Sequence, residues 1–298
     1  MGFPRRGVVP YLLLLLALLA FHGPSLGNGF HYDDEHSLLH NPHLRSLQAL
    51  PSFFADAHTF SVNPDYAMYR PMVVAAHAFN HALGGYEPRG YLALNLALHG
   101  LATLLVFRLL GQLGFPLAPA LAGALVFGLH PAQTEVVNYV SARSESMAGL
   151  FTLAAFSAYL QRRTPAWTLL SALAFALGLL SKSTALVLPL LLLLHRFAFP
   201  PSRPWRDQLP YWVLSVLYVL LYAALSGQGL ERASQVRGVA SQFATQAKAL
   251  VHYLSLAFVP LHLNIQQQFF VSASPFALVP LLAGSAVVSL GLVAWRRP

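Results

Sequence analysis

The sequence contains no cysteine, and it contains little charge of either sign. Without cysteine there is no disulfide framework, no thiolate metal site and no thiol nucleophile, and the redox compartment stays open. Only 9% of the residues are charged, whereas a soluble globular domain carries roughly 25%. Because 56% of the residues are hydrophobic, the composition indicates an integral membrane protein.

The apolar residues form continuous runs and do not alternate at every second position, which argues against a membrane β-barrel. Backbone groups in lipid must be hydrogen-bonded within the protein, so runs of about 20 residues predict helices. We expect one all-α polytopic domain over residues 1–298, with about eight or nine membrane segments. The predicted segments cover residues 8–21, 90–113, 117–129, 142–160, 166–180, 184–197, 211–225, 247–261 and 276–295.

The basic residues lie singly or in pairs between these runs, so the net charge of +8 indicates topology and lipid contact rather than nucleic-acid binding. Arg5 and Arg6 precede the first run, and no clear cleavage site follows it; this predicts an uncleaved first span and a cytoplasmic N-terminus. Residues 22–89 then form a large first extracytoplasmic loop that is too long for an ordinary connection. Residues 247–261 are expected to be re-entrant, because Pro260 breaks the segment.

The polar side chains that interrupt the apolar background gather at the predicted outer ends of the helices. An ionisable group inside or beside a span is costly, so each is a candidate functional residue. No glycine-rich phosphate loop is present, and a bound phosphate would therefore be held by Arg and Lys side chains. The candidates are Asp33, Asp34, Arg70, Asn95, His99, His130, Glu135, Arg143, Glu145 and Lys182.

Structural interpretations compete with these functional ones. Residues 33–35 are three consecutive acids that suit a solvated loop. Asn95 and His99 are four residues apart and would share a helix face, which suits hydrogen bonding between helices. Glu135 and Arg143 would line one face of a continuous helix and form an ion pair. Lys182 would extend to the interface.

Five segments resemble a known family. They are "FHYDDEHSLLHNPHL", "YRPMVVAAHAFNHALGGYEPRGYLALNLALHG", "ALVFGLHPAQTEVVNYVSARSESMAGLF", "GLLSKSTALVLP" and "YLSLAFVPLHL". Over residues 30–263 they resemble, in order and context, the membrane domain of the transmembrane-and-tetratricopeptide-repeat O-mannosyltransferases (TMTC) and their bacterial relatives. These proteins look like GT-C glycosyltransferases.

The resemblance implies transfer of mannose or a similar hexose from a polyprenyl-phosphate carrier to an acceptor protein, at Ser or Thr, or to a glycan. It places the acidic motif of the first outer loop on Asp33 and Asp34, one of which would accept the acceptor's proton. Arg143 and Lys182, with Arg70, would stabilise the departing phosphate. The reaction would take place on the extracytoplasmic face of a bacterial inner membrane or the endoplasmic reticulum. The sequence requires no cofactor, although a divalent cation fits the chemistry.

The chain departs from the family at three points. Ser183 follows Lys182 where relatives often have an acid, and the sequence shows no tetratricopeptide repeats. After the late Pro-x-x-Leu segment, Asn264 and Gln266 stand where relatives usually have an Asp-Tyr pair. These departures favour a second hypothesis, a catalytically inactive membrane scaffold. A third is a transporter or flippase for a lipid-linked or anionic substrate, whose charged residues would lie near the membrane midplane.

Overall fold

A computed structural model describes residues 7–161, 164–199, 204–226 and 238–261, with a few single residues beyond. Contacts divide the chain into two compact units, Met1–Ser226 and Gly227–Pro298. In the second unit the described helix is α12 (Val239–Phe258), which ends two residues before Pro260. The predicted segment 276–295 lies outside the described residues.

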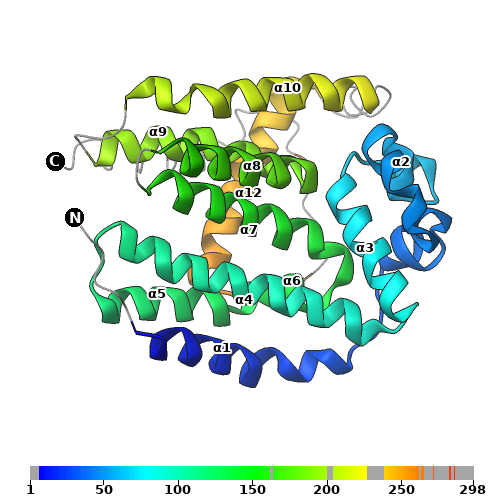
Figure 1. Ribbon diagram of the computed structural model, residues 1–298, viewed down its shortest axis with the longest axis horizontal. Helices are drawn as coiled ribbons and strands as arrows, with labels where there is room; N and C mark the ends of the chain where they lie inside the picture. The colour runs from blue at the N-terminus through cyan, green and yellow to red at the C-terminus, as the bar shows by residue number, and fades with distance from the viewer. Residues whose placement is uncertain are drawn as a thin grey trace. The chain divides into compact units, whose positions relative to one another are not determined.

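The first unit is a bundle of helices with no strand among its described residues. Figure 1 shows the long helices side by side, with α2 and α3 gathered at one end of them. The α-helices are α1 (Val9–His22), α2 (Leu50–Ala55), α3 (Pro71–Gly84), α4 (Pro88–Gln112), α5 (Leu117–Leu129), α6 (Thr134–Asn138), α7 (Arg143–Tyr159), α8 (Pro165–Ser181), α9 (Leu188–Ala198) and α10 (Leu209–Leu225).

Short helical turns connect these helices, and most of them lie in the predicted outer loop. One of them, η2, is a π-helix that follows directly after Asp34. The turns are η1 (Gly23–Gly27), η2 (Glu35–Leu39), η3 (Pro42–Arg45), η4 (Leu47–Ala49), η5 (Ala57–Phe60), η6 (Pro64–Tyr66), η7 (Pro131–Gln133), η8 (Val140–Ala142), η9 (Ser183–Val187) and η10 (Trp205–Gln208).

Local sequence explains where several helices begin and end. Pro71, Pro88 and Pro165 stand at the first position of α3, α4 and α8, where a missing N–H costs nothing and the fixed φ suits the helix. Gly85 and Gly114 follow α3 and α4 with φ of +59° and +92°, a region that favours glycine.

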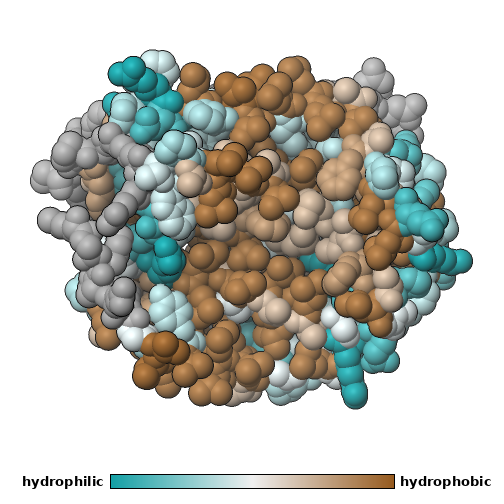
Figure 2. All heavy atoms as spheres, in the orientation of Figure 1, coloured by the Kyte–Doolittle hydropathy of each residue, from teal (hydrophilic) through white to brown (hydrophobic). Residues whose placement is uncertain are grey.

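Three described helical stretches are long and apolar enough to cross a membrane: Val9–Gly27, Pro88–Gln112 and Trp205–Leu225. Leu117–Leu129, Pro165–Ser181 and Ser183–Ala198 are apolar but shorter. The described part of the chain is thus all-α and contains helices that can cross a membrane, as predicted, while the expected eight or nine membrane segments are not confirmed. Figure 2 shows apolar side chains across the middle of one face of the molecule and polar side chains near α2 and α3.

Hydrogen bonds between helices supplement the apolar core. The Tyr211 hydroxyl of α10 donates to Ser171 Oγ of α8 at 2.6 Å, and Ser171 donates to the Ala155 carbonyl of α7, also at 2.6 Å. The Gly128 carbonyl of α5 accepts from His22 and His99 Nε2 at 3.0 and 2.9 Å. These two bonds connect α5 to α1 and α4.

Gly128 also lies where α5 packs closely against α1 and α4. A Cβ at Gly128 would lie 2.9 Å from Thr103 Cγ2 and 3.0 Å from Leu18 Cδ2. Gly128→Ala should therefore lower the free energy of unfolding by about 1–3 kcal/mol, read as a lower melting temperature in detergent.

Gly149→Ala is the matched control, because no atom lies within 4 Å of a Cβ there. Alanine is the better helix former, so this variant should keep or slightly raise the melting temperature. Equal effects of the two substitutions would contradict the close packing at Gly128.

Candidate functional site

The first turn of α7 is anchored by a buried cation. Arg143 is fully buried, and each nitrogen of its guanidinium donates a hydrogen bond. Nε donates to Asn95 Oδ1 at 2.9 Å, Nη1 to Asn80 Oδ1 at 2.7 Å and Nη2 to the Tyr91 carbonyl at 2.9 Å. Because the guanidinium is fully buried and each of its nitrogens donates within the protein, Arg143 connects α3, α4 and α7 and does not face solvent.

The same network positions the segment that precedes α7. The Asn95 amide donates to the Tyr139 carbonyl at 3.0 Å, and the Tyr139 hydroxyl accepts from the Asp33 backbone N–H at 3.1 Å. Tyr139 is extended (φ −114°, ψ 117°) and separates α6 from α7. Glu135 and Arg143 therefore do not lie on one continuous helix, and Arg143 uses amide and carbonyl oxygens in place of the expected ion pair.

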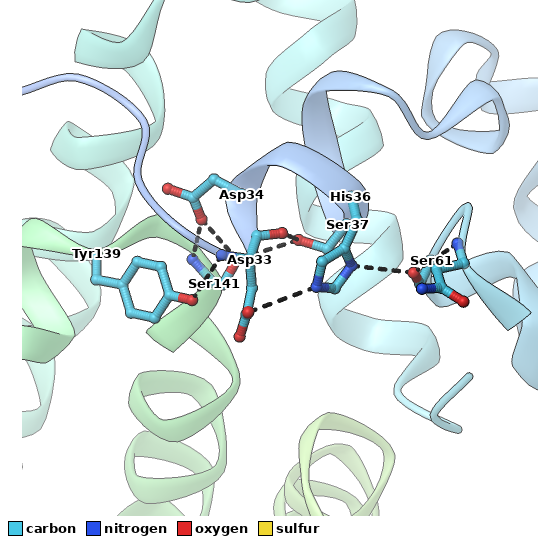
Figure 3. A network of polar contacts seen from close by, with 8 residues as sticks. Asp33, Asp34, His36, Ser37, Ser61, Tyr139 and Ser141 are labelled. Atoms are coloured by element: carbon cyan, nitrogen blue, oxygen red, sulfur yellow. Dashed lines mark hydrogen bonds and ion pairs between the residues drawn. The ribbon is translucent and has the colours of Figure 1, made fainter. Parts of the chain in front are cut away.

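Asp34 is fully buried, and its carboxylate connects the outer loop to the segment before α7 (Figure 3). Its Oδ1 accepts from the Ser141 backbone N–H at 2.8 Å and from Ser141 Oγ at 2.5 Å, and its Oδ2 accepts from the His31 N–H at 3.0 Å. Burial raises the pKa of this carboxyl, and the hydrogen bonds from Ser141 and His31 partly oppose the rise. Both oxygens are engaged, so Asp34 holds the outer loop against the start of α7.

Asp33 behaves differently although it is the adjacent residue. Its side chain is 67% exposed, and Oδ1 lies 3.5 Å from His36 Nε2. His36 Nδ1 is in turn 3.0 Å from Ser61 Oγ, as Figure 3 shows. The Asp33 carboxylate is thus accessible at the surface and oriented by one imidazole.

Two further cations lie at this end of the bundle. Lys182, the residue after α8, forms an ion pair with Glu145 of α7; the side chains are 20% and 43% exposed. Ser144 Oγ also donates to Glu145, and Arg70 Nη1 donates to Ser144 Oγ at 3.2 Å. The four side chains form a chain of contacts, in which Glu145 is the acid that pairs with Lys182.

The pKa shifts of Arg70 and Glu135 reflect the charges around them. Burial lowers the pKa of Arg70, and the charges of Glu145 and Asp33 partly oppose that effect. Partial burial and the nearby Glu145 raise the pKa of Glu135, whereas Lys182 lowers it. Three carboxylates and two cations therefore share one region. Within the described residues, no three His, Asp or Glu side chains are arranged to hold a metal ion.

The remaining candidates lie outside this group of charged residues or form hydrogen bonds in the protein interior. Asn95 and His99 are buried in α4 and form the hydrogen bonds between helices that their spacing allowed. His130 precedes η7, and its Nδ1 accepts from the Ala132 N–H at 3.2 Å. The structure thus groups Asp33, Arg70, Glu135, Glu145 and Lys182 as the accessible polar cluster. Tyr139, Ser141 and His36, which contact the acids, were not among the sequence candidates.

These features define a helical membrane protein with an accessible cluster of charged residues at one end of its bundle. Comparison with known proteins gives its relationship. The chain is 29% identical over 156 residues to the mouse protein O-mannosyl-transferase TMTC3, 32% over 178 residues to mouse TMTC4 and 30% over 191 residues to Drosophila melanogaster Tmtc1. The chain is therefore a relative of the TMTC family.

These matches cover 51%, 53% and 62% of this chain. They cover 17%, 23% and 22% of the relatives, so the chain corresponds to about a fifth of their length. No family model matches the chain, and no solved structure matches it at a significant level.

Asp34→Asn should destabilise the protein, because the amide nitrogen would face a backbone N–H that needs an acceptor. We expect a loss of about 1–3 kcal/mol, measured by thermal unfolding in detergent. Asp33→Asn is the control and should leave the melting temperature unchanged, since its side chain is mainly in solvent. If both variants melt like the wild type, Asp34 does not brace the loop.

Proposed function

We propose that the chain is the membrane part of a polyprenyl-phosphate-dependent glycosyltransferase with a GT-C-like fold. It transfers mannose or a similar hexose to a hydroxyl group of an acceptor protein. The relatives are named protein O-mannosyltransferases, which supports the class of reaction. The proposal is supported by the exposed Asp33 carboxylate, whose charge reaches Arg70, and by the contacts through Ser144 and Glu145 that connect Arg70 to Lys182.

In the proposed reaction Asp33 is the general base. The acceptor oxygen attacks C1 of the sugar, its proton passes to the Asp33 carboxylate, and the bond between C1 and the phosphate oxygen breaks. His36 contacts one carboxylate oxygen, which restricts the orientation of the acid. Asp34 is unsuited to this step because backbone and hydroxyl donors occupy its oxygens. It acts as the positioning residue for its neighbour.

The polyprenyl phosphate leaves with the negative charge of the broken bond. Lys182 and Arg70 supply positive charge for it, and partial burial strengthens that interaction. Arg143 has no such role in this proposal, since its donors are directed into the protein. The pairing of Lys182 with Glu145 keeps the cation in place until the phosphate competes for it.

The proposed topology follows from the location of the cluster. The N-terminus faces the cytoplasm, and the cluster with the loop 22–89 faces the opposite side, where lipid-linked sugars would be used. Charged residues at the end of the bundle favour this arrangement over a transporter, whose site would lie near the midplane. The acid contributed by Glu145 favours an active protein over an inactive scaffold.

Asp33→Asn should reduce sugar transfer by at least about 100-fold, because it removes the base and keeps the shape of the side chain. The measurement is transfer of radiolabelled mannose from polyprenyl-phosphate mannose to acceptor protein by purified chain in lipid. Glu35→Gln is the matched control: this neighbouring acid is exposed and should retain full activity. Unchanged transfer by Asp33→Asn would remove Asp33 from the role of base.

Lys182→Met should weaken use of the donor by about 10- to 100-fold in KM, because the length of the side chain remains and the charge is lost. Glu145→Gln should act in the opposite direction, since it frees Lys182 from its ion pair. A donor titration of both variants measures the two effects. Equal KM values for wild type and Lys182→Met would contradict the phosphate role.

A further inference from the structure

The clearest unpaired polar group near the cluster is a buried phenol. Tyr218 of α10 is 6% exposed, and its hydroxyl has no hydrogen-bond partner among the described residues. Buried tyrosine hydroxyls normally find a partner, because an unpaired donor in the interior costs free energy. The Tyr218 hydroxyl therefore has a hydrogen-bonding capacity that the described residues do not use.

This hydroxyl lies beside the cation of the outer loop. Tyr218 belongs to the same buried cluster as Tyr69, the residue before Arg70. The Arg70 guanidinium is within electrostatic range of the hydroxyls of Tyr218 and Tyr222. Tyr222 follows Tyr218 by four residues, so the two rings lie on one face of α10, with centroids 6.0 Å apart. A half-buried cation and an unpaired hydroxyl thus lie in the same neighbourhood, next to the buried Tyr69.

The other side of α10 is apolar and open. Figure 2 shows apolar side chains along the edge of the molecule where Figure 1 places α10. The stretch Trp205–Leu225 is long and apolar enough to cross a membrane, and little of it is buried. A hydrocarbon chain can follow this surface in the bilayer. Its exposed apolar residues include Val213, Val216, Leu217, Val219, Leu220 and Leu221.

We infer that Tyr218 and Arg70 form the subsite for the phosphate of a polyprenyl monophosphate, whose hydrocarbon tail lies along α10. The phenol donates to one phosphate oxygen, and the guanidinium donates to others. An anion suits the site because both protein groups are donors and one is a cation. A lipid suits the site because Tyr218 belongs to α10, and the exposed side of α10 is apolar. This inference rests on the proposed function and names its donor site.

Tyr218→Phe tests the subsite, because it removes only the unpaired hydroxyl. The melting temperature without ligand should stay unchanged, whereas the affinity for polyprenyl phosphate without sugar should fall about 5- to 30-fold. Binding is measured by titrating polyprenyl phosphate into the purified full chain in nanodiscs. Inorganic phosphate in a parallel titration should bind far more weakly, because it lacks the tail.

Tyr211→Phe is the matched control on the same helix. Its hydroxyl already donates to Ser171, so its loss should lower the melting temperature and leave the affinity unchanged. Equal affinity of wild type and Tyr218→Phe for polyprenyl phosphate would overturn the subsite, as would a wild type that binds none. A wild type that binds polyprenyl phosphate through Tyr218 but transfers no sugar would support the subsite and contradict the proposed reaction.

Discussion

The arrangement of the polar end depends on the burial of one guanidinium. A fully buried cation is strongly unfavourable unless it is hydrogen-bonded, and each nitrogen of the Arg143 guanidinium has a partner among Asn80, Asn95 and the Tyr91 carbonyl. These partners come from α3 and α4, whereas Arg143 begins α7. The three bonds therefore hold α3 and α4 against the start of α7.

The position of the two acids follows from that anchor. Asn95 also holds the Tyr139 carbonyl, so the chain enters α7 along a defined path. On this path, the Tyr139 hydroxyl accepts a hydrogen bond from the Asp33 N–H, and the Ser141 N–H donates one to the Asp34 carboxylate. Two consecutive aspartates thereby acquire opposite properties: Asp34 is buried and fully bonded, and Asp33 is exposed. In the proposed mechanism Asp34 positions Asp33.

Much of the fold was predictable because apolar runs and proline positions are local signals. The runs at residues 90–113 and 117–129 became α4 and α5 within two residues. The number of membrane segments was less predictable, since α5, α8 and α9 are apolar but shorter than a full span. A continuous helix over Glu135 and Arg143 was not realised, because an extended residue at Tyr139 interrupts it.

The site was predictable only in part, for physical reasons. The sequence marked Asp33, Lys182 and Arg143 as unusual, but whether a cation faces a ligand or the interior depends on partners far along the chain. Lys182 and Glu145 are 37 residues apart, so no local sequence spacing predicts their ion pair. Tyr218 stands in an apolar run, where a tyrosine resembles any interfacial aromatic. Its unpaired hydroxyl is visible only in three dimensions.

The most direct measurement of the central claim is an experimental structure of the full chain in a lipid bilayer with bound polyprenyl phosphate. The phosphate should lie within hydrogen-bond distance of Lys182 and Arg70, with the Asp33 carboxylate facing the space where the sugar would be attached. A phosphate bound elsewhere, or an Asp33 turned away from it, would contradict the assignment of this cluster as a glycosyl-transfer site.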